Sequence, residues 1–260
     1  MHPPKKVLNF PFLTGEQIQK VESLAAAQYG LTHSMLMENA GLALAMWIRQ
    51  AAAGQLADRR ILIIAGSGNN GGDGLVAARW LATWGSQIAV ALIKPAASYS
   101  QLFFRNFECF DRLNVPYRHI SEFDFFESAK ASDLIVDCLL GTGTKPESND
   151  LISAAIDQIN RSKVPVISAD IPSGLNGDDG ASFSQIVAAH TTVSFAVPKL
   201  GFLVEGAKVK IGQLVLADIG LAPALFTQIG ITFPHVFIGS GFVKVDLGQF
   251  QTIKQKVTTG

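Results

Sequence analysis

Three short segments of the chain place polar, oxygen-bearing side chains directly after an apolar run. The first is 66–74 (GSGNNGGDG), which follows the apolar residues 61–65. The second is Asp137 with the loop at 141–145, and the third is 170–174 (DIPSG). Carboxylate, amide and hydroxyl groups perform general acid–base catalysis and bind hard cations. The sequence therefore predicts a polar site to which all three segments contribute.

The elements that must position these segments alternate between strand and helix. Continuously apolar runs such as 61–65 and 164–169 indicate strands that are buried on both faces of a sheet. This pattern predicts an α/β fold with a mostly parallel central sheet and helices on both faces. Ligands of such folds bind outside the carboxyl ends of the strands, where the polar segments are expected to meet. The expected helices are 14–30, 32–53, 72–85, 98–116 and 149–162, and the expected later strands are 190–198 and 212–220.

The glycine-rich segment matches the spacing G-x-G-x-x-G of dinucleotide-binding loops. Glycines let a phosphate approach the backbone, and a helix starting at 72–75 would offer free N–H groups to it. A tight turn with Asp73 as the helix cap would explain Gly72 and Asp73, but not the two asparagines between the glycine pairs. A dehydrogenase also needs an acidic residue at the end of the second strand, where this chain has Lys94. An NAD(P)-dependent oxidoreductase is therefore the less favoured hypothesis.

The carboxylates after the later strands suggest an ion site and an acid–base group. Asp137 follows an apolar strand and is expected to be buried, so it needs a cation or hydrogen-bond donors. With Asn70 and Ser173 it would form an oxygen-only set with one charge, which suits a monovalent ion, although a purely hydrogen-bonded aspartate is equally compatible. Asp170 opens a loop that Pro172 makes rigid, which favours a general acid or base over a carboxylate bonded only to its own turn.

The composition excludes several classes of function. Lys and Arg number 21 and so do Asp and Glu, so the chain has no net charge to attract nucleic acid or an anionic membrane. Its apolar runs are too short to span a bilayer, and the first residues do not resemble a signal peptide. Two cysteines, Cys109 and Cys138, fit a reduced compartment, and a cytoplasmic protein is expected. The five histidines are scattered and show no metal-binding spacing.

Five blocks together resemble one known family. They are MENAG (37–41), GSGNNGGDGLVAARWL (66–81), DCLLGTG (137–143), SADIPSGLNGDDG (168–180), and FAVPKLGFL (195–203) followed by GQLVLADIGL (212–221). In this order they are similar to the NAD(P)H-hydrate epimerase family, the YjeF N-terminal domain. The resemblance implies a Rossmann-like three-layer sandwich over residues 1–222, usually a homodimer. It also implies interconversion of the R and S forms of 6-hydroxylated NADH and NADPH, after which a dehydratase restores the cofactor from the S form.

The resemblance also assigns roles to individual residues. It implies one potassium ion per subunit, bound by Asn70, Asp137 and Ser173. Asp170 is expected to contact the substrate, and we predict that it is the catalytic acid–base group; Lys199 is a weaker candidate for phosphate or ring contacts. The other substrate-binding residues that the resemblance implies form two loops: Asn69, Asn70, Gly71, Gly72 and Asp73, and Gly141, Thr142, Gly143, Thr144, Lys145, Pro146 and Glu147.

Residues 223–260 do not resemble this domain and show no nucleotide-binding signature. They are interpreted as a C-terminal appendage of unknown role, or as the stub of a fusion to a dehydratase domain, which this chain does not contain. A non-catalytic nucleotide- or protein-binding module on the same fold is the main alternative to an epimerase. A protein of that kind would bind a nucleotide without equilibrating the two hydrate forms.

Overall fold

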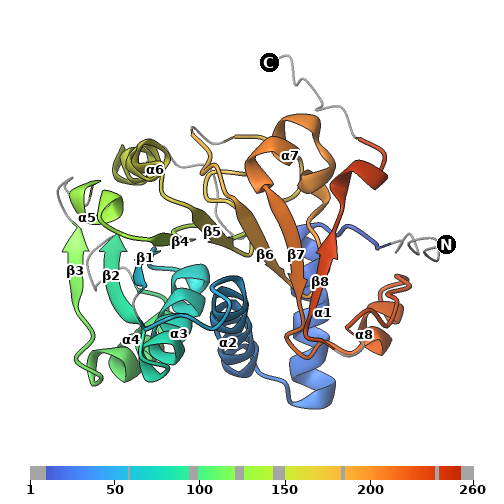
Figure 1. Cartoon of the computed structure of the whole chain (residues 1–260). Coiled ribbons are helices and arrows are strands. Elements are labelled where there is room, and N and C mark those ends of the chain that lie inside the picture. Colours follow the sequence, from blue (N-terminus) through green and yellow to red (C-terminus); the bar gives the residue numbers. More distant parts are fainter. Residues whose placement is uncertain are drawn as a thin grey trace.

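The computed structural model describes residues 10–57, 59–93, 99–120, 126–142, 150–182, 185–237 and 240–252. Its centre is an eight-stranded sheet in the order β3-β2-β1-β4-β5-β6-β7-β8 (Figure 1). Every neighbouring pair is parallel except β7 and β8, which are antiparallel. The strands are β1 (Arg60–Ala65), β2 (Gln87–Ile93), β3 (Tyr117–Ile120), β4 (Leu134–Cys138), β5 (Val166–Ala169), β6 (Thr191–Phe195), β7 (Gln213–Ala217) and β8 (Phe242–Val245).

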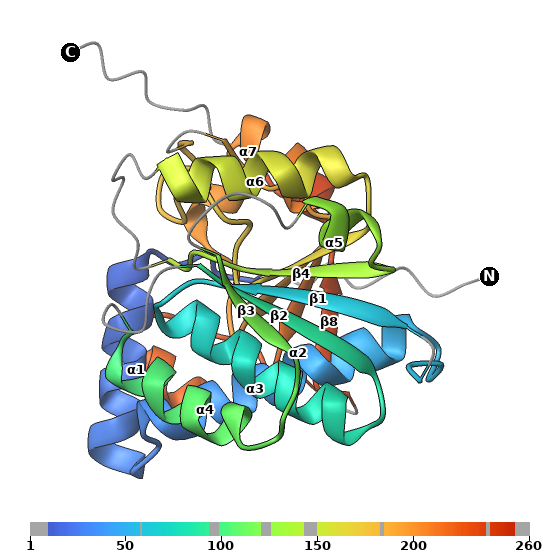
Figure 2. The same cartoon turned by 90° about the vertical axis from the view of Figure 1, so that its left-hand side faces the viewer.

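Helices cover both faces of the sheet, so the fold has three layers. Figure 2 shows α1 to α4 below the sheet and α5 to α7 above it. The helices are α1 (Gly15–Tyr29), α2 (His33–Ala51), α3 (Asn69–Thr83), α4 (Gln101–Asp111), α5 (Phe126–Lys130), α6 (Asp150–Ser162), α7 (Glu205–Ile211) and α8 (Pro223–Thr227). The α/β class and the mostly parallel sheet that the sequence predicts are confirmed. In the part of the chain that the structure describes, no helix has both the length and the apolar character needed to cross a membrane.

The sheet contains a topological switch point, where the order in which strands are added to the sheet reverses. From β1 the chain moves outward through β2 to β3, and then returns to place β4 on the other side of β1. The loops that leave the carboxyl ends of β1 and β4 therefore diverge to opposite faces and open a crevice between them. The two segments 66–74 and 139–142 begin at this crevice, which explains why both lie at the site described below.

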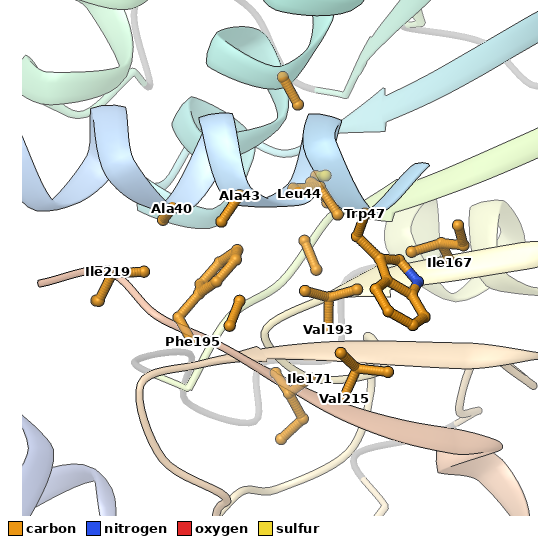
Figure 3. Close-up of a cluster of buried hydrophobic side chains, with 14 of the residues drawn as sticks. Ala40, Ala43, Leu44, Trp47, Ile167, Ile171, Val193, Phe195, Val215 and Ile219 are labelled. Carbon is orange, nitrogen blue, oxygen red and sulfur yellow. The ribbon is translucent and has the colours of Figure 1, made fainter. Parts of the chain in front are cut away.

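The small residues of α2 let it pack closely on α3 and on the sheet. A Cβ atom on Gly41 would lie 2.7 Å from the carbonyl oxygen of Asp73 and would also overlap Val76. Figure 3 shows Ala40 and Ala43 of α2 facing the ring of Phe195, which comes from the end of β6. The helix is buried against the apolar core in this way, so its alanines and glycine serve packing within the chain.

Helix α3 begins three residues earlier than the sequence predicts. The expected start at 72–75 is wrong, because the first helical residue is Asn69 and the N-cap is Gly68 in an extended conformation. Asp73 therefore lies in the second turn and does not cap the helix. The early start is sterically possible because Gly71, Gly72 and Gly74 leave room for neighbouring elements, as described below.

The segment after residue 222 joins the same sheet. Strand β8 pairs with β7 along its whole length, from Leu214 opposite Val245 to Ala217 opposite Phe242. Helix α8 lies against α1, where the side-chain amides of Gln28 and Gln228 bond to each other. Strand β8 covers the edge that β7 would otherwise expose. The division of the chain at residue 222 stays a prediction.

Candidate functional site

A cavity of about 700 Å³ opens at the carboxyl ends of β1, β4, β5 and β6. All three polar segments singled out in the sequence contribute to it, together with α1 and the start of α2. Its polar lining comprises Gln19, Glu22, Ser23, His33, Ser67, Asn69, Asn70, Asp73, Ser100, Thr142, Asp170 and Lys199. The apolar part includes Met37, Leu140, Phe195 and Ile219. A space of this size, with convergent polar groups on an apolar floor, is typical of a small-molecule binding site.

The glycines that open α3 serve mainly to bring segments together. A Cβ atom on Gly71 would overlap the carbonyl oxygen of Gly66, and one on Gly72 would lie 2.7 Å from the sulfur of Met37. Gly74 packs against Cys138 of β4 in the same manner, at 2.8 Å from Sγ. At Gly68, by contrast, an added Cβ would meet nothing within 4 Å. Gly68 therefore belongs to the open rim of the cavity, whereas the later glycines belong to the packed base.

The two asparagines at the start of α3 face different partners. The side-chain oxygen of Asn69 accepts a hydrogen bond of 3.3 Å from the Ser100 hydroxyl. The Asn70 amide donates to the carbonyl oxygen of Leu140 at 2.8 Å. Its Oδ1 atom is buried and has no hydrogen-bond partner among the described residues. A buried acceptor without a donor costs free energy, so Oδ1 of Asn70 is suited to bind a cation or to accept a hydrogen bond from a ligand.

Asp137 lies at the centre of a fully buried hydrogen-bond network. Its carboxylate accepts from the Ser168 hydroxyl at 2.8 Å, the Ser173 backbone N–H at 2.9 Å, the Ser173 hydroxyl at 2.5 Å and the Leu139 N–H at 3.3 Å. Burial raises the pKa of Asp137, and the bonds from Ser173, Ser168 and Leu139 oppose that rise. Both expected features of Asp137, its burial and its need for donors, are confirmed.

Leu140 links this network to Asn70. Its N–H donates to the Ser173 hydroxyl oxygen at 2.9 Å, while its carbonyl accepts from the amide of Asn70. The three residues expected to bind potassium are thus connected in series, from Asn70 through Leu140 to Ser173 and from Ser173 directly to Asp137. Among the described residues, no group of three or more His, Cys, Asp or Glu side chains is placed to hold a metal ion. The chemistry of the donors, neutral oxygens with one carboxylate, fits a large monovalent cation.

Asp170 and Lys199 form an ion pair beside the cavity. The ammonium of Lys199 donates to Oδ1 of Asp170, to the Ser194 hydroxyl at 2.9 Å and to the Val197 carbonyl at 3.3 Å. The lysine side chain is only 2% exposed, whereas that of Asp170 is 15% exposed toward the cavity. The backbone N–H of Phe195 also donates to Oδ1, at 3.2 Å. Both donors bond to Oδ1, and no described residue donates a hydrogen bond to Oδ2, so Oδ2 can contact a ligand in the cavity.

The ends of β5 and β6 both carry tight turns with a positive φ. Asp170 has φ 63°, and the N–H of Ile171 bonds to the carbonyl of Ala169 at 2.7 Å. Ala196 has φ 58°, and the N–H of Val197 bonds to the carbonyl of Phe195 at 2.7 Å. Both are three-residue γ-turns with positive φ, a rare and strained form. Such strain persists where surrounding structure fixes it, and it is concentrated at functional sites.

Two further carboxyl groups share the cavity with Asp170. Burial raises the pKa of Asp73 well above its usual value of 3.8, and the charges of Asp170 and Glu22 add to the rise. Burial also raises the pKa of Glu22, followed by the charge of Asp170, while His33 and Lys199 act in the opposite direction. None of the described residues donates a hydrogen bond to either carboxyl group. The site therefore combines one carboxylate that is paired with an ammonium and two carboxyl groups whose pKa is raised.

The cavity contains some of the residues expected from the sequence and others that were not expected. The structure brings Asn69, Asn70, Asp73, Gly141, Thr142 and Asp170 to one cavity. Gly143, Thr144, Lys145, Pro146 and Glu147, as well as Lys94, lie outside the described residues. Glu22 and His33 were not expected in the site. For Glu22 the sequence does carry a signal. It directly follows Val21 and lies three residues before Ala25, and both are fully buried, so Glu22 borders the packed face of α1.

Comparison with known proteins gives a consistent family. A model described as "YjeF-related protein N-terminus" matches residues 33–201. The NAD(P)H-hydrate epimerase of Rhodopirellula baltica is 31% identical over 227 residues, which cover 87% of this chain and 91% of that protein. The bifunctional NAD(P)H-hydrate repair enzyme Nnr of Moorella thermoacetica is 36% identical over 219 residues, which cover 82% of this chain and 41% of that protein. The chain thus spans about two fifths of the bifunctional relative and most of the monofunctional one.

A solved structure shares the fold. The crystal structure of yeast ynu0 superimposes with a TM-score of 0.78 over 90% of this chain and 100% of the yeast chain, at 22% sequence identity. The superposition supports the three-layer fold.

Proposed function

The chain belongs to the YjeF N-terminal family, and from that premise we propose that it is an NAD(P)H-hydrate epimerase, which interconverts the R and S forms of 6-hydroxylated NADH and NADPH. Relatives that carry this name match most of the chain. The observation that carries the proposal is Asp170, a carboxylate at the end of β5 held by the ammonium of Lys199 on the wall of a cavity of about 700 Å³.

The chemistry of the substrate explains why such a carboxylate is needed. The carbon that bears the hydroxyl is also bonded to the ring nitrogen, so the nitrogen lone pair can expel the oxygen as water once that oxygen is protonated. Water then returns to the opposite face of the planar carbon, which inverts its configuration. A positioned acid or base accelerates such proton transfers by about 10²–10⁴-fold. Asp170, with Oδ1 fixed by Lys199 and Phe195, is the group that receives or returns the proton.

The start of α3 is the proposed place of the dinucleotide. Its first N–H groups have no intrahelical acceptors, and the positive end of the helix dipole favours an anionic phosphate. Gly68 leaves the approach open, and Asn69 and Asn70 offer side-chain amides. Asp73, whose pKa is raised by burial, lines the same end of the cavity. The loop from Gly141 to Glu147 is proposed as the second substrate-binding segment.

A potassium ion is proposed at Asn70, Asp137 and Ser173. Three features support it: the buried Oδ1 of Asn70, which has no partner among the described residues, the single carboxylate, and the bonds that connect Asn70 through Leu140 to Ser173 and on to Asp137. When bound, the ion would supply a positive charge that stabilises this part of the cavity. The readout is thermal unfolding in KCl against NaCl at equal ionic strength, with the expectation that potassium raises the midpoint of the wild type more than that of Asn70→Ala. Equal midpoints in the two salts would remove the ion from the proposal.

A homodimer is proposed from the apolar residues left exposed on α1 and α2. Tyr29 and Met35 are 57% and 50% exposed, and Met46 is 39% exposed. Exposed apolar groups on neighbouring helices are typical of interaction surfaces. Light scattering on a sizing column should give a mass of twice 27.8 kDa.

A dehydratase is the proposed functional partner, because the bifunctional relatives are named as repair enzymes.

The decisive experiment uses a pure R hydrate of NADH. The purified protein should equilibrate it with the S form faster than the spontaneous reaction, as followed by NMR. Asp170→Asn should retain the fold and reduce the catalysed rate by about 10²–10⁴-fold, because the amide can still accept from Lys199 but cannot exchange a proton. Binding of the hydrate without epimerisation by the wild type would favour a non-catalytic binding module instead.

A further inference from the structure

We propose that Glu22 is a second catalytic carboxyl group, which exchanges a proton with the face of the substrate opposite Asp170. This inference rests on the proposed epimerase activity and adds to it. Inversion at one carbon needs one group on each face: the first protonates the oxygen that leaves, and the second takes a proton from the water that enters. Asp170 supplies one of these groups, and the described part of the cavity offers Glu22 for the other.

Glu22 occupies a wall of the cavity that the sheet does not form. It lies in the second turn of α1, whose N-terminal end is fixed by the N–H of Leu13 bonding to Pro198 and that of Leu200 bonding to Leu13. These bonds tie the start of α1 to the segment that contains Lys199. Helix α1 therefore has a fixed position against the loop after β6, and Glu22 reaches the cavity from outside the sheet while Asp170 reaches it from a strand end.

The surroundings of Glu22 and Asp170 differ, as is expected when one group donates a proton and the other accepts one. The Glu22 side chain is 28% exposed, and a ring nitrogen of His33 lies 3.9 Å from its carboxyl group, with the His33 side chain 50% exposed. Asp170 instead has a fully buried ammonium and a backbone N–H on one oxygen. The same charge on Asp170 that a cation stabilises makes a second negative charge at Glu22 less favourable. Burial and, after it, this charge raise the pKa of Glu22 above its usual value, which suits a group that donates a proton, while the ammonium of Lys199 lies against Asp170.

The proton transfers balance within this pair. In the R-to-S direction, the proton of one carboxylic acid moves to the hydroxyl oxygen and the C6–O bond breaks. Its electron pair leaves with water, while the nitrogen lone pair forms the C=N bond of an iminium ion. A water molecule then bonds to C6 from the other face, the C=N pair returns to nitrogen, and the second carboxylate takes the proton. The net result is one proton moved between Glu22 and Asp170, and the reverse reaction moves it back.

The test compares two glutamate variants of the same helix. Glu22→Gln removes the proton-exchanging group from the cavity, whereas Glu16→Gln removes an exposed carboxylate from the first turn of α1, outside the cavity lining. We expect Glu22→Gln to lower kcat by about 100-fold or more, with KM changed by less than about threefold, because the lost interaction acts mainly in the transition state. Glu16→Gln should keep wild-type kinetics.

The pH profile separates catalysis from mere positioning. Glu22 is faced by His33 of α2, Asp73 of α3, and Asp170 and Lys199 of the loops after β5 and β6. The wild-type kcat/KM should fall on the alkaline side as Glu22 loses its proton, at a pH above the usual glutamate value of 4.5. Glu22→Gln should lose that alkaline limb and keep the acidic one. Formate should partly restore the activity of Glu22→Ala, because a small acid can occupy the space left.

The outcomes distinguish this inference from the function on which it rests. If the wild type does not epimerise the hydrate, the proposed function fails. If the wild type is active and Glu22→Gln has an unchanged kcat, or loses activity only through KM with both pH limbs intact, Glu22 is not a catalytic residue. Circular dichroism and the unfolding midpoint of each variant show whether its fold is retained, and Glu22→Asp, which keeps the carboxyl group, should recover part of the rate.

Discussion

The two ends of the cavity differ in where glycine stands relative to tight packing and to positive φ angles. At the start of α3, Gly71, Gly72 and Gly74 have ordinary helical backbones and are needed for close contact with neighbouring segments. At the ends of β5 and β6, Asp170 and Ala196 have side chains and positive φ angles, a conformation that favours glycine. Close packing thus requires glycine at the start of α3, whereas residues with side chains occupy the positive-φ positions of these two turns.

This difference teaches where the chemistry lies. The glycine-rich end supplies a preformed surface, because its geometry follows from helix packing alone. The strained end presents a charged group at an angle that an unstrained strand end would not give, and a buried ammonium holds it there. The glycine-rich segment 66–74 is therefore a preformed surface, although it is the most conspicuous motif in the sequence. The less conspicuous loop that begins at Asp170 carries the proposed reacting group.

The largest effect on stability is expected from Lys199→Met. It leaves the Asp170 carboxylate without its ammonium and the Ser194 hydroxyl without a donor. Removing one partner of a buried ion pair costs about 3–5 kcal/mol, and the low end applies because Asp170 is partly exposed. Urea unfolding measures it, with Lys20→Met on the surface of α1 as the control. A loss below about 0.5 kcal/mol, the usual size for surface changes, would mean that the pair does not organise this end.

The packed glycines should give the next largest effect. Gly71→Ala gains about 1 kcal/mol of helix propensity but forces a Cβ atom onto the carbonyl oxygen of Gly66. Overpacking of this kind costs about 1–3 kcal/mol or more, so we expect net destabilisation. Gly68→Ala meets no atom within 4 Å and should leave the free energy of unfolding within about 0.5 kcal/mol of the wild type. Thermal unfolding of both variants tests the contrast, and equal midpoints would contradict it.

Asp73 should give a more graded effect, which depends on pH. Its pKa in the folded protein is raised above 3.8 by burial, so the native state binds more protons than the unfolded state between the two values. The contribution of Asp73 to the stability of the folded protein is fully present below its pKa in the unfolded state. It is lost as the pH rises through its pKa in the folded state. Asp73→Asn should flatten this decline and be more stable than the wild type at neutral pH. Urea unfolding of both proteins across the pH range measures this. The prediction is refuted if the difference between their urea midpoints is the same at every pH.

The sequence predicted what depends on local pattern. Apolar runs located the strands, and the rule that ligands bind at the carboxyl ends of parallel strands brought Asn70, Asp137 and Asp170 to one edge of the sheet. The start of α3 was predicted too late, because two asparagines and several glycines have weak helix propensity and only the packing of Gly71 and Gly74 stabilises the early turn.

The contribution of α1 could not be predicted in the same way. Glu22 reaches the cavity through the bonds between Leu13 and the segment at Pro198 and Leu200, which join residues almost 190 positions apart. Nothing in the helical pattern of α1 specifies that partner. The ion pair of Asp170 with Lys199 has the same origin, because it depends on two strained turns at the ends of adjacent strands.

The smallest expected effect tests whether the strain itself has a function. Ala196 has φ 58°, which costs an L-residue about 1–2 kcal/mol, while glycine adds about 0.4–1 kcal/mol of unfolded-state entropy. Ala196→Gly should therefore gain about 0.5 kcal/mol of stability and lose activity severalfold, because the freed turn no longer fixes the Phe195 N–H on Asp170. Ala53→Gly, at φ 50° beyond the end of α2 and outside the cavity lining, should gain similar stability with full activity. Unchanged activity in both variants would mean that the strained turn only connects two elements and does not position Asp170.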